Sequence, residues 1–493
     1  MDNSIKIKLS IYGLLSAVSF IYLILAHNPG ISVPVFTIIQ FVSIFTLIYK
    51  REEAKNKKGL LMFVPIYILS LNNYLSGSYL WRAPNFLCTI LLYSTMVAIL
   101  TDNFPVKELN FKFLFKILEH VIFPLRNFNI PFKWINKYKS DDAKKKLHSS
   151  IMLGIFISLP FVVFLLIMLS SADLVFSVKV ENTLEWFSKM LDIELIFKII
   201  FGMIAGLYLF GLLYIVFSEK KSPESKNAPF TLEDLMKPKN ADTIVINILL
   251  SSILLVYTLF IFIQFKYLFA GSVLPGNLNY AEYARRGFFE LIFLSFLNIG
   301  LILLTVYLYK EKIYVQRNKW SNLTKIFMMY LCAVTFVMLI SSFYRMYLYD
   351  QEYGFTRLRV LVYGFLIFES IGLIITAAFI MRPRFNIIAV YIVIGLCYYL
   401  CLNVGQIDYI IAKHNVDMYL AKETDSLDID YLMSLSVDAA PQIARLVENN
   451  NADIMTRYKA DLYFKDIEEN YGSDSLWQSR NYSIDKAMQL ISK

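Results

Sequence analysis

Long apolar stretches separated by short polar segments recur through residues 1–403. A helix needs about 20 apolar residues to cross the hydrocarbon core of a bilayer, and most of these stretches approach or exceed that length. Because lipid offers no hydrogen-bond partners, their backbone is expected to be helical. The pattern predicts about eleven spanning helices, at residues 9–26, 31–49, 60–80, 84–100, 149–170, 194–218, 242–268, 288–309, 321–344, 358–381 and 385–403.

From residue 404 onward the pattern changes, and apolar residues recur at helical spacing without any long apolar run. Asp428 and Ser483 stand where residues that cap helix starts are expected. The sequence therefore predicts an all-α protein: a polytopic transmembrane bundle at residues 1–403, followed by a small soluble helical C-terminal domain at residues 404–493.

Composition and charge placement agree with a membrane protein. The chain is 57% hydrophobic and 18% charged, with a net charge of +9. A basic protein could bind nucleic acid, but here Lys and Arg collect in alternate loops, and no nucleic-acid-binding motif accompanies them. With the N-terminus placed in the cytoplasm, the inner segments carry 29 Lys and Arg residues and the outer loops carry 9. This asymmetry favours a cytoplasmic N-terminus and an extracytoplasmic C-terminal domain.

The inner segment 101–148 mixes Phe, Leu and Ile with basic residues. This composition is typical of an amphipathic helix that lies in the membrane interface and attracts anionic lipid headgroups. A cytoplasmic linker that packs on the bundle would explain the same pattern.

Charged residues near the start of the eighth predicted span form the first candidate polar site. On a helix, Glu282, Arg286 and Glu290 follow one another at four-residue steps, and Arg285 lies beside them. The ladder would anchor the helix at the interface. Alternatively, it would bind a ligand headgroup or the C-terminal domain.

Arg345, Arg357 and Arg359 form a second candidate group, in the segment predicted to be the outer loop between spans nine and ten. Positive charge is disfavoured on this side, so these arginines are expected to be paired. In the same segment Gly354 is typical of a turn, and Thr356 of a helix N-cap.

Glu369 falls in the middle of the tenth predicted span, among apolar residues. A carboxyl inside a membrane is costly, which makes it a functional candidate. Three interpretations stay open: handling of a proton or ion, a protonated structural carboxyl, and a salt bridge to a neighbouring helix. The four histidines are isolated and the four cysteines lie in predicted helices, so neither a metal site nor a cofactor is expected.

Complementary charge predicts contact between the C-terminal domain and the outer loops. Residues 404–493 contain 15 acidic and 9 basic residues, whereas residues 266–287 and 345–359 together contain six basic and three acidic residues. A short linker after the last span keeps the domain close to these loops. We therefore expect Asp408, Asp417 or their helix neighbours to contact the segment Arg345–Arg359.

Three segments carry a resemblance to a known family. These are Tyr280–Leu291, Arg345-Met346 with Tyr353–Arg359, and the tail, which contains Ile411–Asn415 and Leu435–Pro441. The sequence resembles a bacterial family of multi-pass membrane proteins known only as a domain of unknown function. The family often has Asn-Pro-Asp where this chain has Gln406-Ile407-Asp408. The resemblance implies an architecture and brings no catalytic residue.

These observations favour a non-enzymatic protein of a bacterial plasma membrane, in a sensing, regulatory or assembly role. One alternative is a transporter or channel that uses Glu369 and the charged outer segments. Another is a membrane enzyme that acts on a lipid-linked substrate with Glu282 and Glu290 as acid and base. Eight residues on one helix separate those two carboxylates by about 12 Å, which is too far for a tight pair.

Overall fold

The computed structural model contains helices and no strand among the residues it describes. The described residues are 2–49, 51, 54, 56–101, 118–135, 158, 162, 169, 179, 193–218, 243–264, 288–314, 319–383, 385–422, 426–449, 452–472 and 476–491. The segment Glu282–Arg286 therefore lies outside the described residues, and so does the predicted span 149–170 except for three residues.

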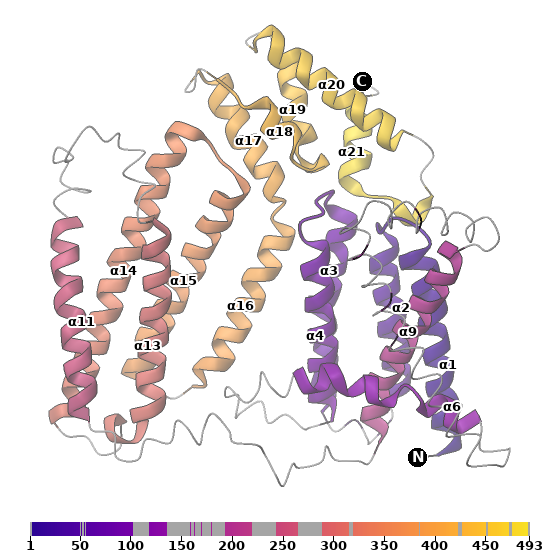
Figure 1. The fold of residues 1–493 in the computed structure, drawn as a ribbon, viewed down its shortest axis with the longest axis horizontal. Helices are drawn as coiled ribbons and strands as arrows, with labels where there is room; N and C mark the ends of the chain where they lie inside the picture. The colour runs from indigo at the N-terminus through magenta and orange to yellow at the C-terminus, as the bar shows by residue number, and fades with distance from the viewer. Residues whose placement is uncertain are drawn as a thin grey trace.

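Figure 1 shows two groups of membrane-type helices side by side, with the C-terminal domain lying over both at the end opposite the N-terminus. We call the groups the first bundle and the second bundle. The first bundle comprises α1 (Asn3–Phe20), the π-helix η1 (Ile21–Leu25), α2 (Ser32–Ile48), η2 (Lys57–Met62), α3 (Phe63–Leu75), α4 (Arg82–Leu100) and α9 (Ile193–Phe217). The second comprises α11 (Thr243–Gln264), α13 (Phe288–Tyr314), α14 (Lys319–Tyr353) and α15 (Arg357–Met381).

Eight helices in the described part of the chain are long and apolar enough to cross a membrane: α1 with η1, α4, α9, α11, α13, α14, α15 and α16 (Ile387–Val404). Helix α2 is apolar but shorter, and α3 has 13 residues. Large apolar side chains such as Leu14, Leu255 and Phe262 are at least 70% exposed. Such surfaces are costly in water and natural against lipid. The protein is thus a multi-span membrane protein, and the count of eleven spans stays a prediction.

Glycines bring α1 and α9 into close contact in the first bundle. A Cβ added to Gly206 would stand 2.6 Å from the Ala17 Cβ, and one added to Gly202 would overlap Ile21. Small residues at four-residue spacing let helices approach closely in lipid, where packing rather than the hydrophobic effect drives association. Replacement of either glycine by a larger residue would force the two helices apart.

Helix α16 connects the two bundles. Its first turns, with Ile387 and Tyr391, pack on the core of the second bundle. Farther along, Leu396, Tyr399 and Leu400 pack on the core of the first bundle. One helix therefore contributes to both cores before the chain enters the C-terminal domain.

The C-terminal domain has a core of its own. It consists of α17 (Ile407–Leu420), α18 (Ile429–Met433), η7 (Val437–Ala439), α19 (Ala440–Glu448), α20 (Ile454–Tyr471), η8 (Trp477–Ser479) and α21 (Tyr482–Ile491). Asp428 and Asp453 cap α18 and α20 by accepting hydrogen bonds from backbone N–H groups. The prediction that Ser483 caps a helix is wrong. The Asn481 side chain caps α21 instead, by accepting hydrogen bonds from the N–H groups of Ser483 and Ile484. Trp81 and Phe355, one from each bundle, pack on this core.

The described part of segment 101–148 lies across the base of the first bundle, where η4 (Phe123–Asn127) and α6 (Ile130–Ile135) form (Figure 1). Trp134 packs against Phe210 and Tyr214 of α9. Leu118, Ile122, Leu125 and Phe132 of the same segment stay exposed. The segment packs on the bundle with one face and presents apolar side chains on another, and its binding of anionic lipid stays a prediction.

Candidate functional site

The structure places the described candidate residues at four separate positions. Glu282, Arg285 and Arg286 lie outside the described residues. Glu290 is exposed in the first turn of α13, and Arg345 is buried within α14. Glu369 is buried in the middle of α15, in the second bundle. Arg357 and Arg359 lie at the turn between α14 and α15, where the C-terminal domain contacts the second bundle.

The prediction of an outer loop at residues 345–359 is wrong for most of that segment, because α14 continues as a helix to Tyr353. The helix continues past the charges because Arg345 and Asp350 are both buried, at 4% and 1% exposure. The turn itself is Gly354–Thr356, and Gly354 has a φ of 68° that favours glycine. Thr356 is the N-cap residue of α15, although its side chain makes no capping hydrogen bond.

Helix α17 of the C-terminal domain holds this turn. The side-chain oxygen of Asn415 accepts a hydrogen bond from the Phe355 N–H at 2.7 Å, and its amide donates to the Phe355 carbonyl at 3.0 Å. The His414 ring stacks on the Phe355 ring at a centroid distance of 3.8 Å. A Cβ at position 354 would approach the Asn415 oxygen to 2.8 Å, so glycine also permits this approach.

Arg359 is directed back toward α14. Its Nε lies 3.5 Å from the Asp350 carboxylate, and its guanidinium stacks over the Tyr349 ring at 4.2 Å. It also donates a hydrogen bond to the Gly354 carbonyl. Arg359 thereby fixes the turn from the inside of the second bundle, while its neighbour Arg357 is free to bond elsewhere.

Arg357 binds Asp408 of α17 through two hydrogen bonds. Its Nε and Nη2 each donate to one carboxylate oxygen at 2.7 Å. The Asp408 side chain is 3% exposed and that of Arg357 35%. Burial by itself would raise the pKa of the Asp408 carboxyl, but the hydrogen bonds from Arg357 and Ser436 outweigh it, and the pKa is lowered. Asp408 is therefore an ionised partner of a charge-assisted, bidentate pair.

The same carboxylate joins α17 to the segment Ser434–Asp438. Asp408 accepts a hydrogen bond from the Ser436 N–H at 3.0 Å. The Tyr431 hydroxyl, from α18 just before this segment, accepts from the Arg357 N–H at 2.9 Å. Asp417, the other acidic residue expected at this contact, pairs instead with Arg445 inside the C-terminal domain.

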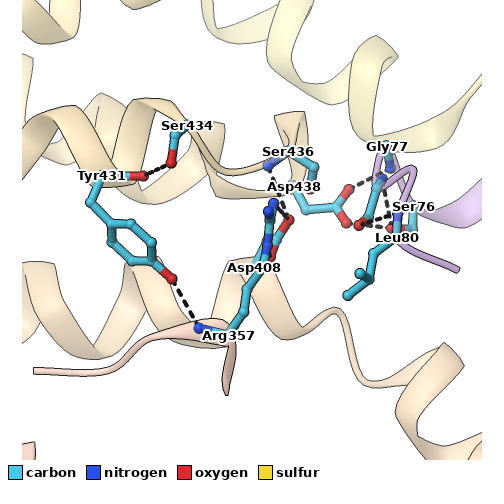
Figure 2. Close-up of polar contacts among 10 residues, drawn as sticks. Ser76, Gly77, Leu80, Arg357, Asp408, Tyr431, Ser434, Ser436 and Asp438 are labelled. Carbon is cyan, nitrogen blue, oxygen red and sulfur yellow. Dashed lines mark hydrogen bonds and ion pairs between the residues drawn. The ribbon is translucent and has the colours of Figure 1, made fainter. Parts of the chain in front are cut away.

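Asp438, at the end of this segment, bonds to the first bundle, as Figure 2 shows. One of its carboxylate oxygens accepts from the Gly77 N–H at 2.7 Å, and the other from the Ser76 hydroxyl at 2.5 Å. Ser76 and Gly77 form the turn after α3, and Asp438 is 4% exposed. Two residues, Ser436 and Asp438, therefore connect the Arg357 contact in the second bundle to the α3–α4 turn in the first. We call this set Arg357, Asp408, Ser436, Asp438, Ser76 and Gly77 the bridge.

A second group of contacts bonds the C-terminal domain to the end of α3. The Asn481 amide donates to the carbonyls of Asn73 and Ser76 at 3.0 and 2.8 Å, and the Ser483 hydroxyl donates to the Leu75 carbonyl at 2.9 Å. The last carbonyls of a helix have no partner within the helix, so these donors satisfy them. The C-terminal domain thus acts as the C-terminal cap of α3.

An amide cluster lies below the C-terminal domain, where α16 passes the first bundle. The Asn403 side-chain oxygen accepts from the Asn85 amide at 2.7 Å, and the Asn403 carbonyl accepts from the Asn72 amide at 2.6 Å. The Tyr399 hydroxyl donates to Asn85 at 2.6 Å. Asparagines buried between membrane helices need such partners. These hydrogen bonds fix α16 to α3 and α4.

Sequence reasoning missed Asp438, Ser76, Gly77 and Asn481. The only signal was indirect, since Asp438 lies in a segment that carries the family resemblance. Its partners are a serine in a polar turn and a backbone N–H, which have no distinctive pattern. Asn72, Asn85 and Asn403 could have been found as amides within or at the ends of apolar runs.

The site binds its own charges rather than presenting them to a ligand. The carboxylates of Asp408 and Asp438 are buried, and both oxygens of each accept hydrogen bonds. Within the described residues, no group of three or more His, Cys, Asp or Glu side chains is arranged to hold a metal ion. The chemistry of the bridge is therefore that of a non-covalent connection.

Comparison with known proteins gives a family and no activity. No curated protein and no solved structure matches the chain. A family model described as a domain of unknown function (DUF4153) matches residues 60–446, which is more than half of the chain. This range includes both ends of the bridge, from Ser76 to Asp438. The chain therefore belongs to the DUF4153 family of domains of unknown function.

Proposed function

We propose that the protein is a non-enzymatic regulator in a bacterial plasma membrane, in which an extracytoplasmic C-terminal domain couples two membrane bundles. The observation that carries this proposal is the bridge. Asp408 bonds to the second bundle, Asp438 bonds to the first, and Ser436 links them within one short segment. A change in the position of either bundle would be transmitted to the other through this segment.

The nature of the contacts supports a coupling role over a catalytic one. A catalytic carboxylate must reach a substrate, whereas Asp408 and Asp438 are 3% and 4% exposed and fully hydrogen-bonded. Coupling requires an element whose conformational equilibrium is shifted by both bundles. The C-terminal domain fits this requirement, since its core also receives Trp81 from one bundle and Phe355 from the other.

The arrangement of the helices together with the distribution of charge supports the proposed extracytoplasmic side for the C-terminal domain. Figure 1 places the C-terminal domain at one end of the bundles and the N-terminus at the other. The first turns of α1, with Lys6 and Lys8, and the start of η2, with Lys57 and Lys58, belong to the N-terminal end, which the positive-inside rule assigns to the cytoplasm. The C-terminal domain is therefore assigned to the outer side.

Distances between the bundles test the coupling directly. Spin labels at Lys58→Cys and Lys319→Cys, in a background without the native cysteines, report on the first and second bundles at the end far from the C-terminal domain; both positions are exposed. We expect one narrow distance distribution by pulsed electron paramagnetic resonance. Asp408→Asn combined with Asp438→Asn should broaden or shift it.

Asp430→Asn provides the matched control. Asp430 also forms an ion pair, with Lys459, but within the C-terminal domain and at an exposed position. This variant should leave the distance distribution unchanged. A double variant of Asp408 and Asp438 with an unaltered distribution would show that other contacts fix the two bundles relative to each other, and it would refute coupling through the bridge.

Labelling of intact cells tests the membrane side. A membrane-impermeant maleimide should react with Glu469→Cys, an exposed position on α20, and should not react with Lys58→Cys until the cells are opened. The reverse pattern would place the C-terminal domain in the cytoplasm.

A further inference from the structure

A hydrogen-bonded carboxyl lies inside the second bundle, away from the bridge. The Ser295 hydroxyl of α13 is 2.8 Å from the Glu369 Oε1 of α15 and 2.7 Å from the Ile292 carbonyl of its own helix. Both oxygen–oxygen distances are those of hydrogen bonds. Ser295 is fully buried and Glu369 is 3% exposed.

The hydrogens at this contact can be counted. A serine hydroxyl has one hydrogen to donate, and an ionised carboxylate and a carbonyl have none. If Glu369 were ionised, Ser295 could satisfy only one of its two neighbours, and the other oxygen pair would be in contact without a hydrogen between them. If Glu369 carries a proton on Oε1, it donates to Ser295, and Ser295 donates to the Ile292 carbonyl. The protonated carboxyl accounts for both short distances with a separate hydrogen in each.

The surroundings of Glu369 agree with the neutral form. Its second oxygen, Oε2, has no hydrogen-bond partner within the described part of the chain, and no described Lys or Arg forms an ion pair with it. Side chains of the apolar core, among them Leu366 and Leu373, occupy neighbouring turns of α15. A buried charge without donors costs far more than a buried acid with one unmet acceptor.

The other titratable groups that the described residues bring to this part of the bundle are a phenol and a thiol. Tyr391 of α16 interacts electrostatically with both Glu369 and Cys332 of α14. Neither a phenol nor a thiol supplies a positive charge that would hold Glu369 in its ionised form. From α13 the group that reaches Glu369 is Ser295, which is not titratable in the accessible range.

From this geometry we infer that Glu369 and Ser295 form a proton-binding site in the second bundle, occupied at neutral pH. Release of the proton requires Ser295 to redirect its hydrogen from the Ile292 carbonyl to the carboxylate, which changes the contact between α13 and α15. The ligand is a proton, and the site is independent of the bridge and of the proposed coupling.

Infrared spectroscopy of the full-length protein tests this inference. At neutral pH the unsubstituted protein should show a carbonyl stretching band of a protonated carboxyl that is absent from Glu369→Gln. Raising the pH should abolish this band reversibly and produce a carboxylate band. Glu290→Gln is the matched control, because Glu290 is an exposed carboxyl on α13, and this variant should retain the band.

A second variant keeps the test valid if Glu369→Gln fails to fold. Ser295→Ala retains the carboxyl and removes its one hydrogen-bond partner among the described residues, so the protonated carbonyl band should shift in frequency. A protein in which Glu369→Gln removes only carboxylate intensity at neutral pH would overturn the inference. So would a protonated band that Ser295→Ala leaves unshifted.

Discussion

The two sides of the bridge use different chemistry. On the second-bundle side, Asp408 meets the guanidinium of Arg357, and opposite charges make the bond. On the first-bundle side, Asp438 accepts hydrogen bonds from a hydroxyl and a backbone N–H, and no cation in the described part of the chain is bonded to it. The first contact depends on the identity of two side chains, while the second depends mainly on the shape of the turn at Ser76 and Gly77.

This difference has consequences for stability. Arg357 is one third exposed, so water and counterions solvate part of its guanidinium when Asp408 is removed. The donors to Asp438 are buried with it, and they have no substitute when the carboxylate is removed. The Asp438 side should therefore be the more costly one to break, although it contains no salt bridge.

The largest effect is expected for Asp438→Ala. Loss of the carboxylate leaves the Gly77 N–H and the Ser76 hydroxyl buried without an acceptor, at about 1–3 kcal/mol each. We expect the free energy of unfolding in detergent to fall by about 3 kcal/mol. Ser76→Ala removes only one of the two bonds and should cost about 1 kcal/mol. Equal losses for the two variants would show that the Gly77 bond contributes nothing.

A smaller loss is expected for Asp408→Ala, of about 2 kcal/mol, because water reaches part of the Arg357 guanidinium. High salt should reduce the difference between this variant and the unsubstituted protein, since screening weakens a partly exposed ion pair. The Asp438→Ala difference should be independent of salt. Thermal unfolding at two salt concentrations separates the two sides, and the same salt response for both would contradict the comparison.

The charged side of the bridge was accessible to sequence reasoning because arginines on the outer side of a membrane protein are unusual. That anomaly selected Arg357 and Arg359, and charge balance then selected Asp408. The Asp438 side has no unusual charge in its sequence, since a serine and a glycine in a polar turn are ordinary. A backbone N–H donor leaves no mark in a sequence at all, so Gly77 could not be identified as a partner of Asp438.

The helical fold was predictable for a similar reason. Apolar runs identify membrane helices directly, and the structure has helices in ten of the eleven predicted spans; the eleventh, 149–170, lies almost entirely outside the described residues. The end of α14 was misjudged because Arg345 and Asp350 were taken as solvent-exposed loop residues, whereas tertiary packing buries them. The grouping of the helices into two bundles depends on packing between distant segments, which hydropathy does not describe.

Strong acid should release the Arg357–Asp408 contact of the bridge. The folded-state pKa of Asp408 is lowered, so its contribution to stability is fully present above its unfolded-state pKa, which is about 4. It is lost as the pH falls through the folded-state value. The stability difference between the unsubstituted protein and Asp408→Asn should thus be constant from pH 5 to 7, at about 1–2 kcal/mol, and vanish in stronger acid. A difference that grows as the pH falls would contradict the ionised assignment.

The smallest effect concerns Gln406, which lies between the two sides of the bridge at the junction of α16 and α17. Its φ of 43° is in the left-handed region, where a residue other than glycine or asparagine loses about 1 kcal/mol. Its side chain donates to the Leu75 carbonyl on the first-bundle side, but at 3.3 Å this bond is long and weak.

Asparagine tolerates this backbone conformation better than glutamine does. We expect Gln406→Asn to raise the free energy of unfolding by about 0.5 kcal/mol, because relief of the backbone outweighs loss of the Leu75 bond. Gln406→Ala keeps the strain and loses the bond, so it should be less stable than the unsubstituted protein. If Gln406→Asn is destabilised as much as Gln406→Ala, the Leu75 bond outweighs the strain. The junction would then belong to the first-bundle side of the bridge rather than being neutral between the two.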